Sequence, residues 1–396
     1  MATTQLHKKV FGESCSILEN ICIFVEMSGL YIHIPFCKRQ CGYCDFARTT
    51  KLRLMPSVTQ RMHEELRDEV PFLADRKIRT IYFGGGTPSL LRPAELEQFI
   101  EEAREMFDCK AVEEITAEVN PDDVTAEYVE ALRRTSINRV SMGIQSLDDE
   151  CLRFMGRRHT AAKAIEAVRL LQSGGFDNLS VDIIFGIEGF GHESLQRTLN
   201  GITSLDVQHI SAYHLTIEPT TRFGRLLSEG RLRQVAEERS EEEFLRVHEH
   251  LTKAGFEHYE VSNYALPGYR SRHNSSYWTG AEYLGIGPGA HSFAGGVRRW
   301  CMQSPEEYIE QVRYGSEVLT SRDRLNEYLM TSLRRVEGIS LDHITSEFGE
   351  EQATRIVQLT TPIVARGALV RQGAQLAIPP EKFLVSDAVI ESLFDV

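Results

Sequence analysis

The chain has 396 residues, a formal net charge of -13 at pH 7, 42% apolar residues and 26% charged residues. Its length favours two or three hydrophobic cores, and its composition is that of a globular protein rather than a disordered one. An acidic balance without clustered Lys and Arg argues against nucleic acid and anionic membrane surfaces as partners. No apolar run reaches the roughly 18 residues of a membrane-spanning helix.

Residues 1–26 have neither the basic start nor the small-residue cleavage site of a secretory signal. Together with eight cysteines, this favours a cytoplasmic protein with reduced thiols. We expect residues 1–28 to be a disordered extension and the native chain to start at Met27. Five scattered cysteines are interpreted as inert or buried thiols, namely Cys15, Cys22, Cys109, Cys151 and Cys301.

From residue 29 to 220, short β-rich runs alternate with amphipathic helical patterns such as 91–107 and 160–174, which is typical of parallel βα units. The expected strands are "LYIHI" at 30, "RTIYF" at 79, "EEITAEV" at 113, "INRVSMG" at 137, "LSVDIIF" at 179 and "HISAYHLTI" at 209. Right-handed crossovers between such strands predict an α/β fold, a partial six-unit (β/α) barrel.

Chemically active residues gather at the carboxyl ends of these strands. Three cysteines follow the first strand and "GGGTP" at 84–88 follows the second. Later strands contribute Glu118, Asn120, Gln145, Asp182, Tyr213 and Glu218. Because the carboxyl ends of barrel strands meet at one mouth, we expect these residues to form one site.

The strand–helix alternation stops after residue 220. A charged helix is expected over 228–254, "HYEVSNYA" at 258 is expected to be a strand, and 267–296 is rich in Gly and aromatic residues. We interpret 221–320 as a region that completes the barrel. The tail 321–396 alternates helices with a hairpin, "GALVRQGAQLAIPP", whose turn Gly373 can supply. This pattern predicts a mostly helical, winged-helix-like C-terminal domain.

The cysteines Cys37, Cys41 and Cys44 are separated by three and then two residues, so one short loop can carry three thiolates to one metal centre. A structural zinc site would need a fourth ligand such as His33, and unrelated buried thiols are a second alternative. An iron–sulfur cluster on three cysteines leaves one iron open, as a catalytic metal requires. The neighbours expected to shield it from water are Phe36, Tyr43 and Phe46.

This cysteine motif resembles that of the radical S-adenosylmethionine (SAM) superfamily. The resemblance implies a 4Fe–4S cluster on the three cysteines, SAM bound to the fourth iron through its amino and carboxylate groups, and cleavage of SAM to a 5′-deoxyadenosyl radical. From Tyr31 to the C-terminal helix the chain is similar to the HemN and HemW types of the oxygen-independent coproporphyrinogen oxidase branch. The SAM site that this implies consists of Tyr31, Tyr43, Gly85, Gly86, Thr87, Glu118, Gln145, Arg157 and Asp182.

Two features favour the HemW type, whose members are haem chaperones. Phe46 stands where HemN enzymes carry a further cysteine, and their long N-terminal extension is missing. A third feature is "RHNSSYW" at 272–278, which contains the H-N-x-x-Y-W signature of HemW proteins. The haem-binding residues that this implies are His273, Asn274, Tyr277 and Trp278. An imidazole can ligate haem iron, although a histidine that only packs in a core is the commoner case.

The chain departs from the family at one loop. The usual Gly-Leu-Pro-Gly-Gln after the fifth strand is replaced by Gly186, Ile187, Glu188, Gly189 and Phe190. This difference puts the shape of one side of the SAM pocket in question.

Our interpretation is a radical SAM protein that binds haem and passes it to haem-requiring proteins. The resemblance also implies an electron donor such as a flavodoxin or ferredoxin, and a homodimer. One alternative is a coproporphyrinogen III dehydrogenase that decarboxylates propionates. Another is a zinc protein whose winged-helix-like tail contacts nucleic acid, which the acidic charge disfavours.

Overall fold

The structure is a computed structural model that describes residues 28–395. In this part of the chain a 12-stranded sheet runs in the order β12-β11-β10-β9-β1-β2-β3-β4-β5-β6-β8-β7. Its centre consists of parallel strands in sequence order, β1 (Ser28–Ile34), β2 (Ile78–Gly85), β3 (Glu114–Val119), β4 (Arg139–Gln145), β5 (Leu179–Phe185) and β6 (His209–His214). The predicted strands are confirmed, although the last ends at His214 rather than at residue 217.

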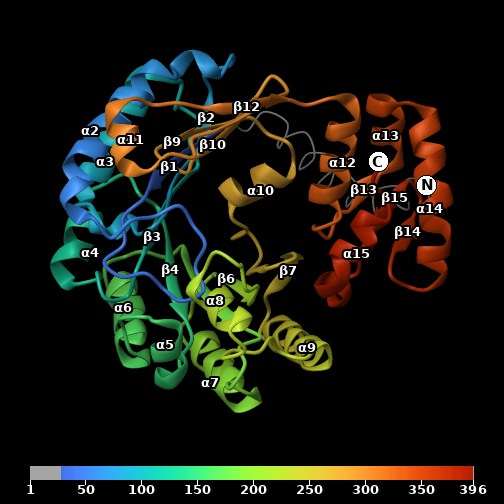
Figure 1. The fold of residues 1–396 in the computed structure, drawn as a ribbon, viewed down its shortest axis with the longest axis horizontal. Coiled ribbons are helices and arrows are strands. Elements are labelled where there is room, and N and C mark those ends of the chain that lie inside the picture. The colour runs from blue at the N-terminus through green and yellow to red at the C-terminus, as the bar shows by residue number, and fades with distance from the viewer. Residues whose placement is uncertain (1–27, 396) are drawn as a thin grey trace, which may run out of the picture.

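Helices cover the outside of the curved sheet (Figure 1). They are α2 (Met55–Asp68), α3 (Pro93–Met106), α4 (Ala126–Leu132), α5 (Asp149–Met155), α6 (Ala161–Ser173) and α7 (His192–Thr203). In α6, Thr160 caps the first turn by accepting a hydrogen bond from the Lys163 N–H, and the helix stops at Gly174, as predicted. In α3, Pro93 occupies the first turn, where its missing N–H has no cost.

The alternation of side chains along each strand separates an apolar outer face from a polar inner face. In β4, Val140, Met142 and Ile144 are buried in the hydrophobic core under the helices. Arg139 and Ser141 lie on the opposite face of the same strand. We call the space enclosed by the inner faces of β1 to β6 the lumen.

Further strands extend the sheet on both sides without closing it. On the β1 side the strands follow outward as β9 (Tyr283–Ile286), β10 (His291–Ala294), β11 (Val297–Trp300) and β12 (Gly315–Val318). On the β6 side they follow outward as β8 (Asn263–Ala265) and β7 (Glu257–Glu260). In the described residues the sheet thus ends at β12 and β7, so the predicted partial barrel is confirmed.

Two expectations for this region are wrong in detail. "HYEVSNYA" is not one strand, because the chain turns between Glu260 and Asn263 and β7 pairs antiparallel with β8. The charged helix does not start at 228. α8 (Arg222–Ser228) ends there, Gly230 adopts a left-handed conformation with φ 67°, and α9 (Glu237–Lys253) begins later.

The C-terminal part has the winged-helix-like order that the sequence predicts. It contains α12 (Ser321–Ser332), β13 (Ile339–Ser340), α13 (Leu341–Phe348), α14 (Glu350–Ala365), β14 (Val370–Gln372), β15 (Gln375–Ala377) and α15 (Ser386–Glu391). Gly373, with φ 63°, lies in the turn between the antiparallel strands β14 and β15. These helices lie on the open side of the sheet, beside α10 (Arg272–Trp278) (Figure 1).

Within residues 28–395 no helix is both long and apolar enough to cross a bilayer. The scattered cysteines of this range are free thiols, of which Cys151 and Cys301 are buried, as interpreted, and Cys109 is half-buried. The expectations for segment 1–28, including the start at Met27, and those for Cys15 and Cys22 concern residues that, except for Ser28, lie outside the described range.

Candidate metal and cofactor site

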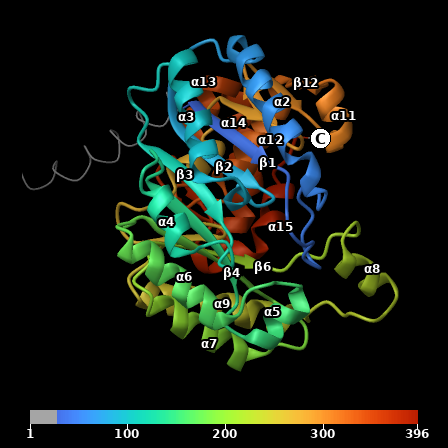
Figure 2. The ribbon, with the colours of Figure 1, turned by 90° about the vertical axis from the view of Figure 1, so that its left-hand side faces the viewer.

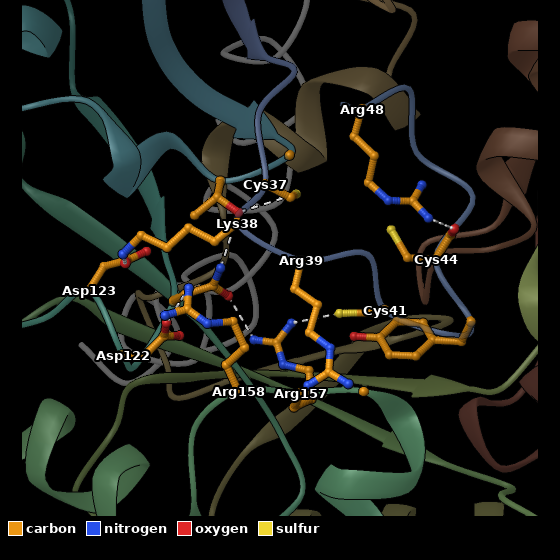
Figure 3. A pocket seen from close by; sticks show the side chains of 15 residues that line it. Cys37, Lys38, Arg39, Cys41, Cys44, Arg48, Asp122, Asp123, Arg157 and Arg158 are labelled. Atoms are coloured by element: carbon orange, nitrogen blue, oxygen red, sulfur yellow. Dashed lines mark hydrogen bonds and ion pairs between the residues drawn. The ribbon is translucent and has the colours of Figure 1, made fainter. Parts of the chain in front are cut away.

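The three cysteines lie in the loop that follows β1 and line one pocket at the carboxyl ends of the strands (Figure 3). The pocket also includes Tyr43 of the same loop, and Gly86, Thr87, Asn120 and Arg157, which come after β2, β3 and β4 in the chain. The pocket opens to solvent, and polar and charged side chains make up much of its lining. The predicted convergence therefore holds for the cysteines, Gly86, Thr87 and Asn120, whereas the other strand-end residues of the prediction do not line this pocket, namely Glu118, Gln145, Asp182, Tyr213 and Glu218.

Backbone hydrogen bonds fix the cysteine loop. The Cys37 N–H donates to the Thr49 carbonyl at 3.0 Å, and the Gly42 N–H donates to the Met155 carbonyl at 2.9 Å. The Gly42 carbonyl accepts from the Phe223 N–H at 2.9 Å, which places α8 against the loop (Figure 2). A side chain at Gly42 would collide with the Phe223 ring at 2.5 Å, so this contact requires glycine.

Polar groups surround the cysteine sulfurs. The Thr87 hydroxyl donates to Cys37 Sγ at 3.3 Å, and Arg157 Nη1 donates to Cys41 Sγ at 3.7 Å. Burial raises the pKa of the Cys37 thiol to about 11, against the hydrogen bond from Thr87, and burial also raises the pKa of Cys44, against the charge of Arg48. A bound metal deprotonates its thiol ligands outright. These donors then face thiolates, which suits an anionic cluster.

The zinc alternative requires a fourth ligand beside the three cysteines. The proposed fourth ligand His33 is buried, its Nε2 contacts the Ala47 carbonyl at 2.8 Å and its Nδ1 contacts the Tyr31 hydroxyl at 3.0 Å. Sulfurs spread around one pocket suit a polynuclear cluster, in which each cysteine binds a different iron.

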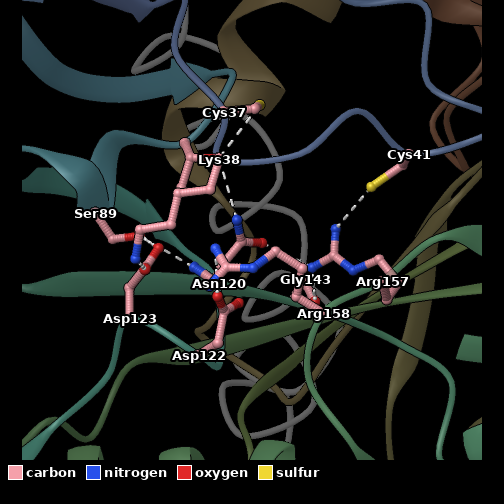
Figure 4. Close-up of polar contacts among 11 residues, drawn as sticks. Cys37, Lys38, Cys41, Ser89, Asn120, Asp122, Asp123, Gly143, Arg157 and Arg158 are labelled. Carbon is pink, nitrogen blue, oxygen red and sulfur yellow. Dashed lines mark hydrogen bonds and ion pairs between the residues drawn. The ribbon is translucent and has the colours of Figure 1, made fainter. Parts of the chain in front are cut away.

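Arg157 connects the cysteine loop to the strand ends (Figure 4). Its Nη2 donates to Asn120 Oδ1 at 2.7 Å and to the Gly143 carbonyl at 2.6 Å. Asn120 Nδ2 in turn donates to the Thr87 hydroxyl at 3.1 Å. The sequence had marked Asn120 as a strand-end residue without assigning it a role; the structure makes it the link between Thr87 and Arg157.

Charged residues at the pocket rim were missed altogether. Lys38 forms an ion pair with Asp123, which also accepts a hydrogen bond from the Ser89 hydroxyl at 2.9 Å, and Arg158 pairs with Asp122 at 2.9 Å. In the sequence such residues look like ordinary surface charges. The available signal is their position: Lys38 follows Cys37, Asp122 and Asp123 follow β3, and Arg158 follows Arg157.

The end of β2 requires glycine at two positions of the run 84–86. Gly85 has φ 102°, which favours glycine, and a Cβ on Gly86 would lie 2.7 Å from the Phe36 carbonyl oxygen. Only glycine lets this backbone approach the cysteine loop so closely. Gly86 and Thr87 line the pocket, whereas Gly85 lies just before it.

Glu118 and Asp182 lie in the lumen beneath the pocket and line none of its walls. Glu118 accepts a hydrogen bond from the Tyr82 hydroxyl at 2.8 Å, and Asp182 accepts one from Ser141 at 3.4 Å. Burial raises the pKa of Glu118 to about 7, and burial raises that of Asp182 to about 6, against a hydrogen bond from Ser211. Both carboxyl groups therefore remain partly protonated in a weakly acidic solution.

Gln145 carries two marks of a ligand-binding residue. It is one of two non-glycine residues with positive φ in the described chain, at 68°, and strain of this kind clusters at functional sites. Its side chain is buried, and its Oε1 has no hydrogen-bond partner in the structure. A buried amide oxygen without a partner is costly, so a bound donor would satisfy it.

The remaining predicted residues have different surroundings. Tyr43 lines the pocket, Phe36 belongs to the core, and Phe46 is 65% exposed, so the expectation that Phe46 shields the site is wrong. Tyr31 lies deeper in the lumen, stacked on Tyr82 with centroids 6.1 Å apart.

The loop 186–190 lies outside the cysteine pocket. The Gly186 N–H donates to Glu243 at 2.8 Å, and Arg239 of α9 donates to the Ile187 carbonyl at 3.1 Å and the Phe190 carbonyl at 2.5 Å. Gly189 has φ 88°, and Glu188 pairs with Arg239 at 3.4 Å. This loop, whose sequence differs from the family's usual one, is therefore bonded to α9 through Glu243 and Arg239.

The predicted haem residues form the helix α10, whose start packs against the amino-terminal halves of β2 and β3. His273 is fully buried; its Nδ1 contacts the Thr80 hydroxyl at 2.8 Å and its Nε2 contacts the Tyr277 hydroxyl at 2.9 Å. Its ring stacks on Tyr82 with centroids 5.0 Å apart. Burial lowers its pKa to about 3, so the imidazole is neutral, but in this conformation neither nitrogen is free for iron.

The other motif residues are more accessible. Asn274 donates its backbone N–H to the Ser271 cap at 3.3 Å, and Trp278 ends the helix half-buried. Tyr277 packs edge-to-face on Tyr283 of β9, with centroids 4.7 Å apart. The structure thus brings the motif into the lumen from the end away from the cysteines.

Comparisons with known proteins agree with this geometry. Residues 31–202 match the description "Radical SAM superfamily", and residues 319–385 match "HemN C-terminal domain". A solved structure of coproporphyrinogen III oxidase (HemN) from Escherichia coli has a TM-score of 0.78 with 21% identity, covering 97% of this chain and 94% of that one. At this identity the match supports the fold. The protein is therefore a radical SAM protein, a class that holds a 4Fe–4S cluster and SAM.

Several curated relatives are similar over most of their length, and each is named heme chaperone HemW. The protein from Lactococcus lactis is 33% identical over 80% of this chain and 84% of its own, and that from Escherichia coli K12 is 34% identical over 78% and 82%. The protein from Bacillus subtilis is 30% identical over 82% of this chain and 87% of its own. The chain belongs to the HemW family.

Proposed function

We propose that this protein is a haem chaperone that binds a 4Fe–4S cluster, SAM and haem, and delivers haem to haem-requiring proteins. The observation that carries the proposal is the position of α10: the H-N-x-x-Y-W motif lies in the same lumen as the residues proposed for SAM, and His273 stacks on Tyr82. The names of the relatives support it.

The residues proposed for the cluster and SAM have suitable chemistry. Cys37, Cys41 and Cys44 would hold the cluster, which supplies an open iron when bound. Arg157 Nη2 already donates to Asn120 and Gly143, so Arg157 can donate to an anionic group through Nη1, and Gln145 Oε1 can accept from a donor on the nucleotide. The SAM residues proposed around them are Tyr31, Tyr43, Gly85, Gly86, Thr87, Glu118 and Asp182.

Haem binding through α10 would engage His273, Asn274, Tyr277 and Trp278. Since both nitrogens of His273 have partners, ligation requires the ring to give up the contacts with Thr80 and Tyr277. Those are neutral hydrogen bonds, each of which contributes about 1 kcal/mol net, so an iron ligand can replace them.

Electron supply and assembly belong to the same proposal. The cysteine pocket of this acidic chain has a cationic rim of Lys38, Arg39 and Arg158. Asp123 and Asp122 pair with Lys38 and Arg158, but the pocket also contains Arg48 and Arg157, so positive charge stays in excess among its charged side chains. Such a rim suits an acidic redox protein, for example a flavodoxin or ferredoxin. We further propose a cytoplasmic location, a homodimer, and domain limits of 29–220, 221–320 and 321–396.

The test is anaerobic reconstitution followed by haem titration and transfer. The proposal predicts that the protein with its cluster binds haem and passes it to an apo-haem protein, and that it forms no protoporphyrinogen from coproporphyrinogen III. Production of protoporphyrinogen at a catalytic rate, without haem transfer, would instead establish the oxidase function.

A further inference from the structure

A buried arginine lies unpaired in the lumen, away from the cysteine pocket. Arg139 is the first residue of β4 and is 1% exposed. Its Nε and Nη1 have no hydrogen-bond partner among the described residues. Thr116, directly beside it in the sheet register, has a buried hydroxyl that also lacks a partner. Buried polar atoms of this kind are rare, because an unmade hydrogen bond in the interior costs free energy.

The surroundings of Arg139 are polar and come from several strands. Besides the effect of burial, the positive charge of Arg139 acts to lower the pKa values of six surrounding side chains, namely Tyr82, Glu118, Asp182, His209, Tyr259 and His273. Both ring nitrogens of His209 already have hydrogen-bond partners: Nδ1 lies 2.7 Å from the Ser180 hydroxyl, and Nε2 lies 2.8 Å from the Tyr259 hydroxyl. Glu118 bonds to Tyr82 rather than to the guanidinium. Nearby carboxylates thus balance the charge of Arg139 without using its free N–H groups.

We propose that Arg139 binds a carboxylate of the ligand that enters the lumen, and that this carboxylate is a propionate of haem. The inference rests on the proposed haem-binding function and names the group that the lumen recognises. A guanidinium holds a carboxylate with two parallel hydrogen bonds when Nη2 acts together with either Nε or Nη1, and the Nε and Nη1 atoms of Arg139 are both buried without a partner. The Thr116 hydroxyl can add a third donor at the same place.

The position along β4 separates this carboxylate from that of SAM. Arg157 contacts the strand at Gly143, four residues beyond Arg139, which corresponds to about 13 Å of strand. A SAM carboxylate would belong at the far end, beside the cysteines and Arg157. Arg139 instead acts on His273 of α10, so the guanidinium and the proposed iron ligand lie toward the same end of the lumen. A ligand with both an iron and carboxylates suits this pair.

The experiment compares haem with haem dimethyl ester, in which both propionates are blocked, by absorbance titration of the reconstituted full-length protein. Wild type is predicted to bind haem about tenfold or more tightly than the ester. Arg139→Gln is predicted to lower the affinity for haem by a similar factor and to abolish the preference for haem over the ester. Its iron content and SAM affinity are predicted to stay unchanged. The matched control is Arg134→Gln, an exposed arginine shortly before β4, which is predicted to keep the wild-type preference.

Equal binding of haem and ester by wild type would overturn the proposal, as would a preference that survives in Arg139→Gln. Weaker SAM binding in Arg139→Gln with an unchanged haem preference would assign the carboxylate to SAM and also overturn it. If wild type binds neither haem nor the ester, the haem function itself fails, and the inference with it. Should Arg139→Gln not fold, Arg139→Lys keeps the charge but loses the fork. A reduced preference there supports the proposal, and a full preference contradicts it.

Discussion

At the scale of single residues, the lumen combines carboxyl groups, a buried arginine and a neutral histidine within a few strands. Burial is the largest influence on the pKa values of Glu118, Asp182 and His273. Burial raises the pKa of Glu118 to about 7, the charge of Asp182 raises it further, and the hydrogen bond from Tyr82 only partly opposes these effects. Such perturbed groups are typical of functional sites.

The raised pKa of Glu118 predicts a pH dependence of stability. The folded protein binds more protons than the unfolded chain between the unfolded pKa of 4.5 and the folded pKa of about 7. Stability from this group is therefore present at low pH and is lost as pH rises through that window, by up to about 3 kcal/mol. Glu118→Gln should remove this loss and be more stable than wild type above pH 7.

The measurement is the free energy of urea unfolding of SAM-free protein at pH 5 and pH 8 for wild type and Glu118→Gln. Glu101→Gln on the exposed face of α3 serves as the control. A difference between wild type and Glu118→Gln that is the same at both pH values would contradict the assignment of a raised pKa.

A second residue-scale prediction concerns the partners of His273. If His273 ligates haem, Thr80→Val or Tyr277→Phe removes a hydrogen bond that holds the ring away from iron. Each variant should accelerate haem association about fivefold, because a bond of about 1 kcal/mol no longer has to break. Stopped-flow absorbance measures the rate. The acceleration should vanish in a His273→Ala background; an acceleration that persists there would mean that another group binds the iron.

At the scale of elements, α10 is a helix of seven residues, too short to be stable by itself. It is held at its start by Ser271, which caps Asn274, and by the buried carboxylate of Glu114, which accepts from the N–H groups of Arg272 at 2.9 Å and His273 at 3.0 Å. Anions at a helix start are stabilising. The first turn of α10 thus depends on β3.

Glu114→Gln is predicted to destabilise the fold by about 1–3 kcal/mol, because an amide replaces a buried anion that accepts two backbone hydrogen bonds. Its neighbour gives a matched control: Glu113 forms exposed ion pairs with Arg272 and Arg79, and Glu113→Gln should cost less than about 1 kcal/mol. Chemical denaturation of both variants checks this. Equal losses would show that the Glu114 contacts do not hold the helix.

The same elements show what the sequence could predict. The strands β1 to β6 and the cap and stop of α6 follow local rules of alternation and capping, so they were predictable. The turn between β7 and β8 was missed, since "HYEVSNYA" is apolar enough for one strand. The exposure of Phe46 and the partners of His273 depend on residues far apart in sequence, such as Thr80, which no local pattern reveals.

At the scale of the whole molecule, the two ends of the lumen have different chemistry. The cysteine loop, Arg157 and the cationic rim occupy the carboxyl ends of the strands, and α10 with Arg139 lies toward the amino ends. The C-terminal helices lie on the open side of the sheet beside α10 (Figure 1). A ligand bound near α10 would therefore lie beside the surface that the C-terminal part contributes.

The cysteines give the whole-molecule prediction. Cys37→Ser, Cys41→Ser and Cys44→Ser should each lose most of the iron and sulfide of the reconstituted protein, since in the proposed site all three thiolates would hold one cluster. The buried Cys301→Ser, outside the pocket, should keep the wild-type content. Iron and sulfide analysis checks this, and a full complement in all three variants would remove these cysteines as ligands.

The central claim is that three cysteines leave one iron of a cluster open for SAM. It is tested most directly by electron paramagnetic resonance of the reduced, reconstituted protein with and without SAM. The account predicts a 4Fe–4S signal whose g-values shift when SAM is added, because SAM binds the open iron. A cluster signal that SAM leaves unchanged, or a protein that takes up zinc and no iron, would contradict it.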